Sequence, residues 1–445
     1  MTPAGADEPK QSGTTAWILA VLVVALGVAP AGAQERRAIP RLSGPVQIDG
    51  RVDEAAWEAI DPLPAVMSSP TFGAPPSERT ELRLGYDDKY LYASGRMFDR
   101  SPDRIQSTSL KRDETSMSND WFILNLDTFR DRETTLVFAT NPAGVRTEGV
   151  FSGDGGTWSG TWNAVWGAAA SQDADGWYAE IRIPLSSLRF ETVGDKVAMG
   201  ATISRWVARN SESISWPGIP YDWGSNSIYK ASRMADIELA GVTRTNPIQV
   251  VPYVLGGVAR NVALTPDRTG YLPRNTSARE PGLDLKLTPT NSLTLDLTVN
   301  TDFAQVEADD QQVNLTRFSL FFPERRLFFQ ERAGVFEYSL GDNQQLFYSR
   351  QIGLINGAPV RIYGGARAVG RARGWDVGVL NMQTEGAAGS ASENNGVARV
   401  RRQLFNENSY LGAIATTRLG ADGRNVTLGA DALVRVFDQD SLVLN

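Results

Sequence analysis

The chain has 445 residues, of which 42% are hydrophobic and 21% charged, a balance typical of folded rather than disordered proteins. Its formal net charge of −7 argues against nucleic acid as a partner, because such proteins need a basic surface to neutralise phosphates. Cysteine and histidine are both absent, which excludes disulfides, cysteine- or histidine-ligated metals and Ser-His-Asp catalysis.

The first 33 residues have the pattern of a secretory signal peptide. Lys10 is the only basic residue before an apolar run from Trp17 to Val28, and Ala31-Gly32-Ala33 fits the small-residue rule for cleavage. The run is shorter than the roughly 20 residues that a membrane-crossing helix needs. Residues 1–33 are therefore predicted to be removed on export, with an uncleaved anchor or a buried helix as the alternative.

Residues 41–242 are predicted to form a soluble β-sandwich. Short apolar segments alternate with turn residues, and no helix-period stripe of useful length follows the signal. Glu54 to Ile60 is the one short helix expected here. The predicted strands include Leu82–Tyr86, Tyr90–Ser94, Trp121–Leu126 and Trp177–Ile183. The sequence pattern changes near residues 241–247, from short, strongly apolar segments to longer alternating ones, and this change marks the end of the domain.

Residues 243–445 show longer alternating segments, which favour an antiparallel outer-membrane β-barrel. Leu283–Thr288 and Leu293–Val299 alternate cleanly, and Val426–Val436 does so again. In Arg361–Arg373, one face is expected to carry Ile362, Gly364, Ala366, Ala368, Gly370 and Ala372, and the other Arg361, Tyr363, Arg367, Arg371 and Arg373. A soluble sheet with one wet face produces the same alternation and is the alternative.

About eight strands are expected between residues 248 and 437, following the ten-residue alternation of such barrels. The pattern stops at Ser441–Asn445 without a terminal aromatic residue, so the barrel is expected to be incomplete at the C-terminus. The fold class predicted for the whole chain is all-β: a sandwich followed by the first part of a barrel.

Four blocks of the first domain resemble the family 9 carbohydrate-binding modules (CBM9). They are Ile48-Asp-Gly-Arg-Val-Asp-Glu-Ala-Ala-Trp57, Tyr86-Asp-Asp-Lys-Tyr-Leu-Tyr92, Asn119-Asp-Trp-Phe-Ile-Leu-Asn-Leu-Asp127 and Gly176-Trp-Tyr-Ala-Glu-Ile-Arg-Ile-Pro184. The resemblance covers residues 45–240 and implies a CBM9-like fold and a carbohydrate or glycan ligand. Trp57 and Trp177 lie in these fold-defining blocks and are expected in the core.

A second resemblance lies in the second domain. Asn300-Thr-Asp-Phe-Ala-Gln-Val-Glu-Ala-Asp309, Val313-Asn-Leu-Thr-Arg-Phe318 and Phe321-Phe-Pro-Glu-Arg-Arg-Leu-Phe-Phe-Gln-Glu331 resemble the hallmark of the uncharacterised DUF5916 family. In that family a CBM9-like domain precedes an outer-membrane barrel. The resemblance therefore implies the architecture and an outer-membrane lipid environment, without an established activity.

Tryptophans in a Gly/Ser-rich stretch are the best candidates for binding a sugar, since C–H faces of sugars pack on indole rings. Trp158, Trp162 and Trp166 are spaced by four, which in a strand would place them on one face as an aromatic wall. Asp154 and Asn163 in the same stretch are the polar candidates. Burial in the core is the competing interpretation for all three rings.

No cofactor is expected. Asp99, Asp120, Asp127, Asp131 and Asp154 offer oxygens for calcium, but the spacing of a calcium-binding loop is absent, and solvated turns are the alternative.

The hallmark segment 300–337 is dense in charge. Its candidate residues are Asp302, Glu307, Asp309, Asn314, Arg317, Glu324, Arg325 and Glu331. Phenylalanine pairs interleave with these charges, which favours a loop folded into the barrel lumen and held by ion pairs to arginine-lined strands. Catalysis by two of its carboxylates is the alternative, although nothing in the segment marks a general acid.

These features predict an outer-membrane carbohydrate-binding protein whose sandwich binds a glycan and whose barrel anchors or transports. A carboxylate-based glycoside hydrolase of carbohydrate catabolism and a structural surface protein without sugar binding are the two alternatives. If the first barrel strand begins on the periplasmic side, the sandwich lies in the periplasm.

Overall fold

The computed structural model describes residues 36–242, 248–265, 267, 269–301, 324–338, 340, 345–355, 358–386, 391–406, 408–421, 423–435 and 441–445. The predicted signal peptide and residues 243–247 of the domain boundary lie outside these ranges. Among the described residues, no helix has the length and apolar character needed to span a membrane.

The N-terminal region contains a ten-stranded sheet, whose main path is β1-β14-β12-β5-β6-β7-β8. Strands β11 and β13 also pair with β12, and β2 pairs with β13. The bounds are β1 Arg37–Ala38, β2 Val66–Ser69, β5 Trp121–Asp127, β6 Thr135–Thr140, β7 Arg146–Ser152, β8 Thr157–Ser159, β11 Thr192–Val193, β12 Lys196–Val207, β13 Glu212–Trp216 and β14 Ala235–Ala240.

A second sheet of four strands has the order β3-β4-β10-β9. Its strands are β3 Thr80–Tyr86, β4 Tyr90–Phe98, β9 Gly167–Gln172 and β10 Gly176–Pro184. The four strands predicted from this region are thus confirmed, and helix α1 spans Ala55–Glu58 inside the predicted helical segment. Short 3-10 turns are η1 Pro102–Arg104, η2 Leu185–Ser187, η3 Ala208–Asn210, η4 Tyr221–Trp223, η5 Ser227–Tyr229 and η6 Ala231–Arg233.

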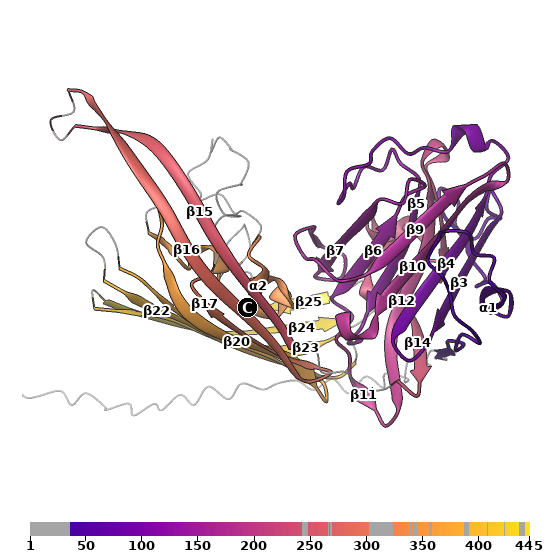
Figure 1. The fold of residues 1–445 in the computed structure, drawn as a ribbon. Coiled ribbons are helices and arrows are strands. Elements are labelled where there is room, and N and C mark those ends of the chain that lie inside the picture. The colour runs from indigo at the N-terminus through magenta and orange to yellow at the C-terminus, as the bar shows by residue number, and fades with distance from the viewer. Residues whose placement is uncertain are drawn as a thin grey trace, which may run out of the picture. The chain divides into compact units, whose positions relative to one another are not determined.

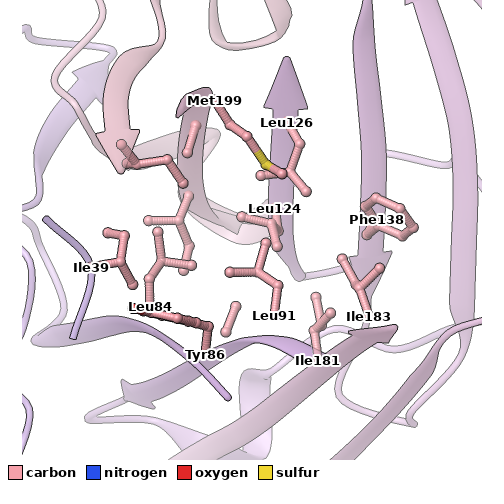
Figure 2. Close-up of a cluster of buried hydrophobic side chains, with 14 of the residues drawn as sticks. Ile39, Leu84, Tyr86, Leu91, Leu124, Leu126, Phe138, Ile181, Ile183 and Met199 are labelled. Carbon is pink, nitrogen blue, oxygen red and sulfur yellow. The ribbon is translucent and has the colours of Figure 1, made fainter. Parts of the chain in front are cut away.

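The core of this region lies between the two sheets, where alternate side chains of each strand point inward (Figure 2). Leu84 of β3 and Ile181 of β10 meet Leu124 of β5 and Met199 of β12. Complete burial of one such side chain contributes roughly 1.5–3 kcal/mol to folding. The two layers confirm the predicted sandwich.

A buried carboxylate fixes the chain before α1 to strand β10. Glu180 accepts hydrogen bonds from Trp57 Nε1 and the Gly50 N–H, both at 2.9 Å, and from the Asp49 N–H at 3.1 Å. Gly50 has a φ of +82°, and a Cβ there would lie 2.6 Å from the Ala170 backbone, so the position requires glycine. Burial raises the pKa of Glu180 to about 7 against these hydrogen bonds. Trp57 is a core residue, as predicted.

We expect Trp57→Phe to destabilise the chain by about 1–3 kcal/mol, because it removes a donor from buried Glu180. The pKa of Glu180 lies above its ordinary value of 4.5, so stability falls as pH rises from that value to about 7. The N–H of Trp57 then stabilises the ionised form, and the loss should be larger at pH 8 than at pH 5. Urea unfolding followed by circular dichroism measures both losses.

Trp177→Phe is the matched control for this experiment. Trp177 is equally buried, but its Nε1 has no hydrogen-bond partner among the described residues. Its loss should not depend on pH, and a Trp57→Phe loss that is equal at the two pH values would contradict the assigned role of Glu180.

The C-terminal region is built on a nine-stranded antiparallel sheet in chain order, β15-β16-β17-β20-β21-β22-β23-β24-β25. The first two strands form a long hairpin (Figure 1). The bounds are β15 Ile248–Leu264, β16 Tyr271–Thr290, β17 Leu293–Val299, β20 Ile362–Ala372, β21 Trp375–Thr384, β22 Glu393–Gln403, β23 Tyr410–Gly420, β24 Gly423–Arg435 and β25 Ser441–Leu444. Smaller elements are α2 Leu327–Gln330, η7 Ala333–Phe336, η8 Ser349–Gln351 and the β18–β19 pair, Leu354–Ile355 with Ala358–Pro359.

One face of this sheet carries an unbroken apolar row. Its successive cross-strand partners are Ile248, Leu287, Leu295, Ala368, Val379, Ala398, Ala415 and Leu428. No residue of this row is buried, and half of them are exposed: Val379 is 47% and Leu428 76% accessible to solvent. A water-soluble sheet normally shows the opposite arrangement, with its apolar face covered.

The opposite face carries paired charges and is covered in part by residues 328–338 and 346–352. Arg367 pairs with Asp296 at 3.0 Å, and Arg399 pairs with Asp431 through two bonds of 2.6 Å. Tyr338, just after η7, donates a hydrogen bond to the Ala430 carbonyl at 2.8 Å. The alternation predicted for this region is confirmed, with polar side chains on the covered side.

The closed barrel expected from the sequence is not seen. Within the described ranges β15 and β25 are the edges of the sheet and do not pair with each other. The described architecture is therefore all-β, as predicted, with a sandwich and an open antiparallel sheet.

The faces expected for Arg361–Arg373 need one correction. The register of β20 with β21 shifts between Ile362 and Gly364. As a result Ile362 is buried on the covered side with Arg367, while Tyr363 is exposed. An irregularity of one residue exchanges the two faces of a strand. A prediction from strict alternation does not detect such an irregularity, so it assigned Ile362 and Tyr363 to the wrong faces.

Candidate binding site

The predicted wall of three tryptophans on one strand does not form. Trp158 lies in β8, which ends at Ser159, so Trp162 and Trp166 follow in irregular chain. Trp166 is buried in the sandwich core, with its ring centroid 5.4 Å from that of Phe138. A spacing of four defines a common face only while the strand continues. Trp166 therefore offers little surface to a ligand.

Trp158 lines two hollows at the edge formed by β7 and β8. Its ring lies against β7 because residue 149 is glycine: a Cβ there would come within 2.2 Å of the Trp158 ring. The small hollow, of about 180 Å³, is an aromatic cleft that Trp121, Phe151 and Tyr229 also line. The other is a cavity of about 840 Å³, which we call the large cavity.

The large cavity joins residues that are far apart in the sequence. Trp158, Trp162 and Asn163 of the sandwich line it together with Glu324 and Glu331 of the hallmark segment. Apolar side chains, among them Phe328 and Val335, form much of the remaining wall. Hydroxyl groups also line the cavity, from Thr128, Thr134, Ser152, Thr157, Ser159, Ser186, Ser187, Tyr348 and Ser349. The structure thus brings together candidates of two kinds, aromatic and charged.

Glu331 is held by ion pairs inside this cavity. Its carboxylate lies 2.5 Å from Lys286 Nζ and 3.4 Å from Arg189 Nε, and accepts a hydrogen bond from Thr294 Oγ1 at 2.8 Å. Burial alone would raise the pKa of Glu331, but Lys286 and Arg189 outweigh it and hold that pKa well below its usual range. The residue lacks the proton that a general acid donates. Its contacts instead fit a structural role, in which ion pairs hold the hallmark segment against the sheet and the sandwich.

The other candidate residues of the hallmark segment differ in their relation to the large cavity. Glu324 forms an ion pair with Arg326 at 2.8 Å and accepts a hydrogen bond from Ser349 Oγ at 2.6 Å, while Arg325 does not line the cavity. The remaining candidates, Asp302, Glu307, Asp309, Asn314 and Arg317, lie outside the described residues.

Asp154 has a structural role and lines neither hollow. Its carboxylate accepts hydrogen bonds from the N–H and Oγ of Ser232 at 2.9 and 2.8 Å and pairs with Arg435 at 2.8 Å. The protein itself thus occupies the oxygens of Asp154, and the contact of this residue with a ligand stays a prediction.

The other carboxylates considered for calcium serve separate local contacts. Asp99 pairs with Arg209 at 2.6 Å, and Asp120 accepts the Ala208 N–H at 3.0 Å. Asp127 and Asp131 accept backbone N–H groups of the turn between β5 and β6. No group of three or more acidic side chains suited to a metal ion occurs in the described part of the chain.

Two cations of the site were missed by sequence reasoning. Lys286 is the one cation on the polar side of Leu283–Thr288, and this isolated position was a usable signal. Arg189 follows η2 in the sandwich and has no local pattern that marks it. Its role arises only from a contact with Glu331, 142 positions along the chain.

Comparison with known proteins bears first on the C-terminal sheet. Residues 248–362 match the family model described as a domain of unknown function, DUF5916. The match runs from the first residue of β15 to the first of β20 and contains the hallmark segment that carried the resemblance. No curated protein matches the chain.

Solved structures that are similar to the chain include the following two. Both are a carbohydrate-binding module of family 9 from Caldicellulosiruptor kristjanssonii, in complex with cellotriose and with glucose. Each is 19% identical and covers 47% of this chain. The matches extend over 95% and 97% of those modules, with TM-scores of 0.32 and 0.34 respectively.

Proposed function

We propose that this protein is an outer-membrane glycan-binding protein, in which the large cavity holds the glycan and the nine-stranded sheet anchors the chain in lipid. The observation that carries glycan binding is the lining of the cavity: two indoles together with hydroxyl and amide groups. Indole faces pack against sugar C–H groups, and the polar groups replace the water lost by sugar hydroxyls.

Membrane anchoring is supported by the exposed apolar face of the sheet. Strands β20 to β23 have 10 or 11 residues each, close to the 9–11 that cross a bilayer as tilted strands. Trp375 is exposed at the start of β21 and lies against Arg402, with the guanidinium 5.1 Å from the ring centroid. Aromatic and basic side chains of this kind favour the membrane–water interface.

The lengths of the connections favour a periplasmic sandwich. At one end of the sheet the strands are joined by 291–292, 373–374, 404–409 and 436–440. At the other end they are joined by 265–270, 300–361, 385–392 and the short 421–422, so the two longest connections lie at this second end. Outer-membrane strands have short periplasmic turns and longer external loops. Strand β15 begins at the first end, since Ile248 pairs with Leu287 near the end of β16, and the sandwich precedes β15.

A glycan array probed with the full chain in detergent micelles tests glycan binding, followed by titration of the best ligand. We expect Trp162→Ala to weaken that ligand about tenfold, because one stacking surface is worth roughly 1 kcal/mol beyond its buried area. Trp223→Ala is the control, since Trp223 is also half-buried but lines neither hollow. An array without any bound glycan, or equal effects of the two changes, would contradict the proposal.

A further inference from the structure

We propose that the ligand of the large cavity is a glycan carrying free, protonated amino groups, and that Glu337 is the side chain that receives one of them. This inference rests on the proposed glycan binding and names the class of glycan. It follows from the charges of the cavity lining and from the partners each charge already has.

Carboxylates outnumber cations in the cavity. Seven acidic side chains line it, against four basic ones: Asp127, Asp131, Asp284, Asp296, Glu324, Glu331 and Glu337 against Arg189, Lys286, Arg332 and Arg367. Burial raises the pKa of Asp127 to about 8, so this residue is neutral at pH 7 and six acidic side chains remain to be counted. An excess of negative charge in a walled cavity concentrates cationic ligands and disfavours anionic ones. A glycan rich in uronate, sulfate or phosphate is thus a poor match, and an amino-sugar polymer a good one.

The four cations are already paired. Arg189 and Lys286 share Glu331, Arg367 lies 3.0 Å from Asp296, and Arg332 lies 2.7 Å from Asp376. None of them needs a ligand to balance its charge. A second anion at these positions would have to displace a protein carboxylate first.

Glu337 is the acidic side chain of the lining that remains open to a ligand. It is solvent-accessible at the end of η7, and within the described residues its carboxylate has one hydrogen bond, from Ser152 Oγ at 3.2 Å, and no ion pair. Surrounding protein partly desolvates it, which raises its pKa against that hydrogen bond and against the positive charge of Arg401, which is nearby but forms its ion pair with Glu133. A ligand ammonium would give the ionised form a direct ion-pair partner.

The aromatic residues of the cavity suit the same cation. Trp158 and Trp162 line the cavity that Glu337 lines, and an ammonium group is attracted to an indole face at distances within about 6 Å. Acetylation of the amine removes its charge and with it both interactions. The neutral acetamide keeps only the stacking of the sugar ring.

Titration calorimetry of the full chain in micelles tests this with two probes of equal length, the glucosamine tetrasaccharide and its N-acetylated form. We expect the wild type to bind the free-amine probe at least tenfold more tightly. Glu337→Gln should remove that preference while leaving binding of the acetylated probe unchanged. Glu58→Gln, the same change at an exposed residue of α1 outside the cavity, should leave the preference intact.

The possible outcomes separate this inference from the proposed function. Equal binding of the two probes by the wild type, or a preference that survives Glu337→Gln, overturns the role of Glu337 while glycan binding stands. Failure of the free-amine probe to bind also overturns it, and the glycan array then decides glycan binding independently.

Discussion

Val379→Arg is expected to prevent stable assembly of the sheet in the outer membrane. Val379 lies in the middle of β21 and of the apolar row across the sheet. A basic residue near the bilayer midplane costs roughly 2–4 kcal/mol in a membrane strand. The variant should therefore be depleted from the outer-membrane fraction of cells and should refold less stably into lipid vesicles.

A second exposed valine provides the control. Val193 in β11 of the sandwich is 82% exposed and lies outside the nine-stranded sheet. Val193→Arg makes the same chemical change where no lipid is expected, and should leave both measurements as in the wild type. If Val379→Arg behaved like Val193→Arg, the apolar face would not contact lipid.

Arg399→Met is expected to destabilise the sheet by about 3–5 kcal/mol. Arg399 is 1% exposed and binds Asp431 through two bonds of 2.6 Å, so its removal leaves a buried carboxylate without its partner. The double change Arg399→Met with Asp431→Leu should recover most of that loss, since no charge then remains buried. Urea unfolding of vesicle-inserted protein measures both losses.

Arg418 makes a matched comparison on the same sheet. It also binds one carboxylate, that of Glu393, through two bonds of 2.8 Å, but its side chain is 64% exposed. Arg418→Met should cost less than about 1 kcal/mol, because water replaces the lost partner. Similar losses of unfolding free energy for Arg399→Met and Arg418→Met would mean that water reaches Asp431 on the covered face.

The sequence predicted best those features that depend on short periods and local turns. Leu293–Val299 alternates over seven residues, and the structure forms β17 with these same bounds. Such patterns carry their own physical cause within a few positions.

Features that depend on where a strand ends, or on distant partners, were not predictable in the same way. The tryptophan wall failed because β8 stops at Ser159, and the faces of β20 changed at one register shift. The ion pair between Arg189 and Glu331 joins two regions that are far apart in the sequence, and sequence periodicity carries no information on such a contact. Closure of the sheet is a property of its two edges, which no single alternating segment encodes.

The position of Trp158 has a thermodynamic consequence. Its one indole helps to wall both the aromatic cleft and the large cavity, so a ligand that moves this ring in one space also changes the wall of the other. Occupants of the two spaces are then linked: if filling the first changes the affinity of the second by some factor, the reverse coupling has the same size. A side chain at residue 149 would occupy the place of the ring, so any such substitution must displace Trp158 and alter both spaces together.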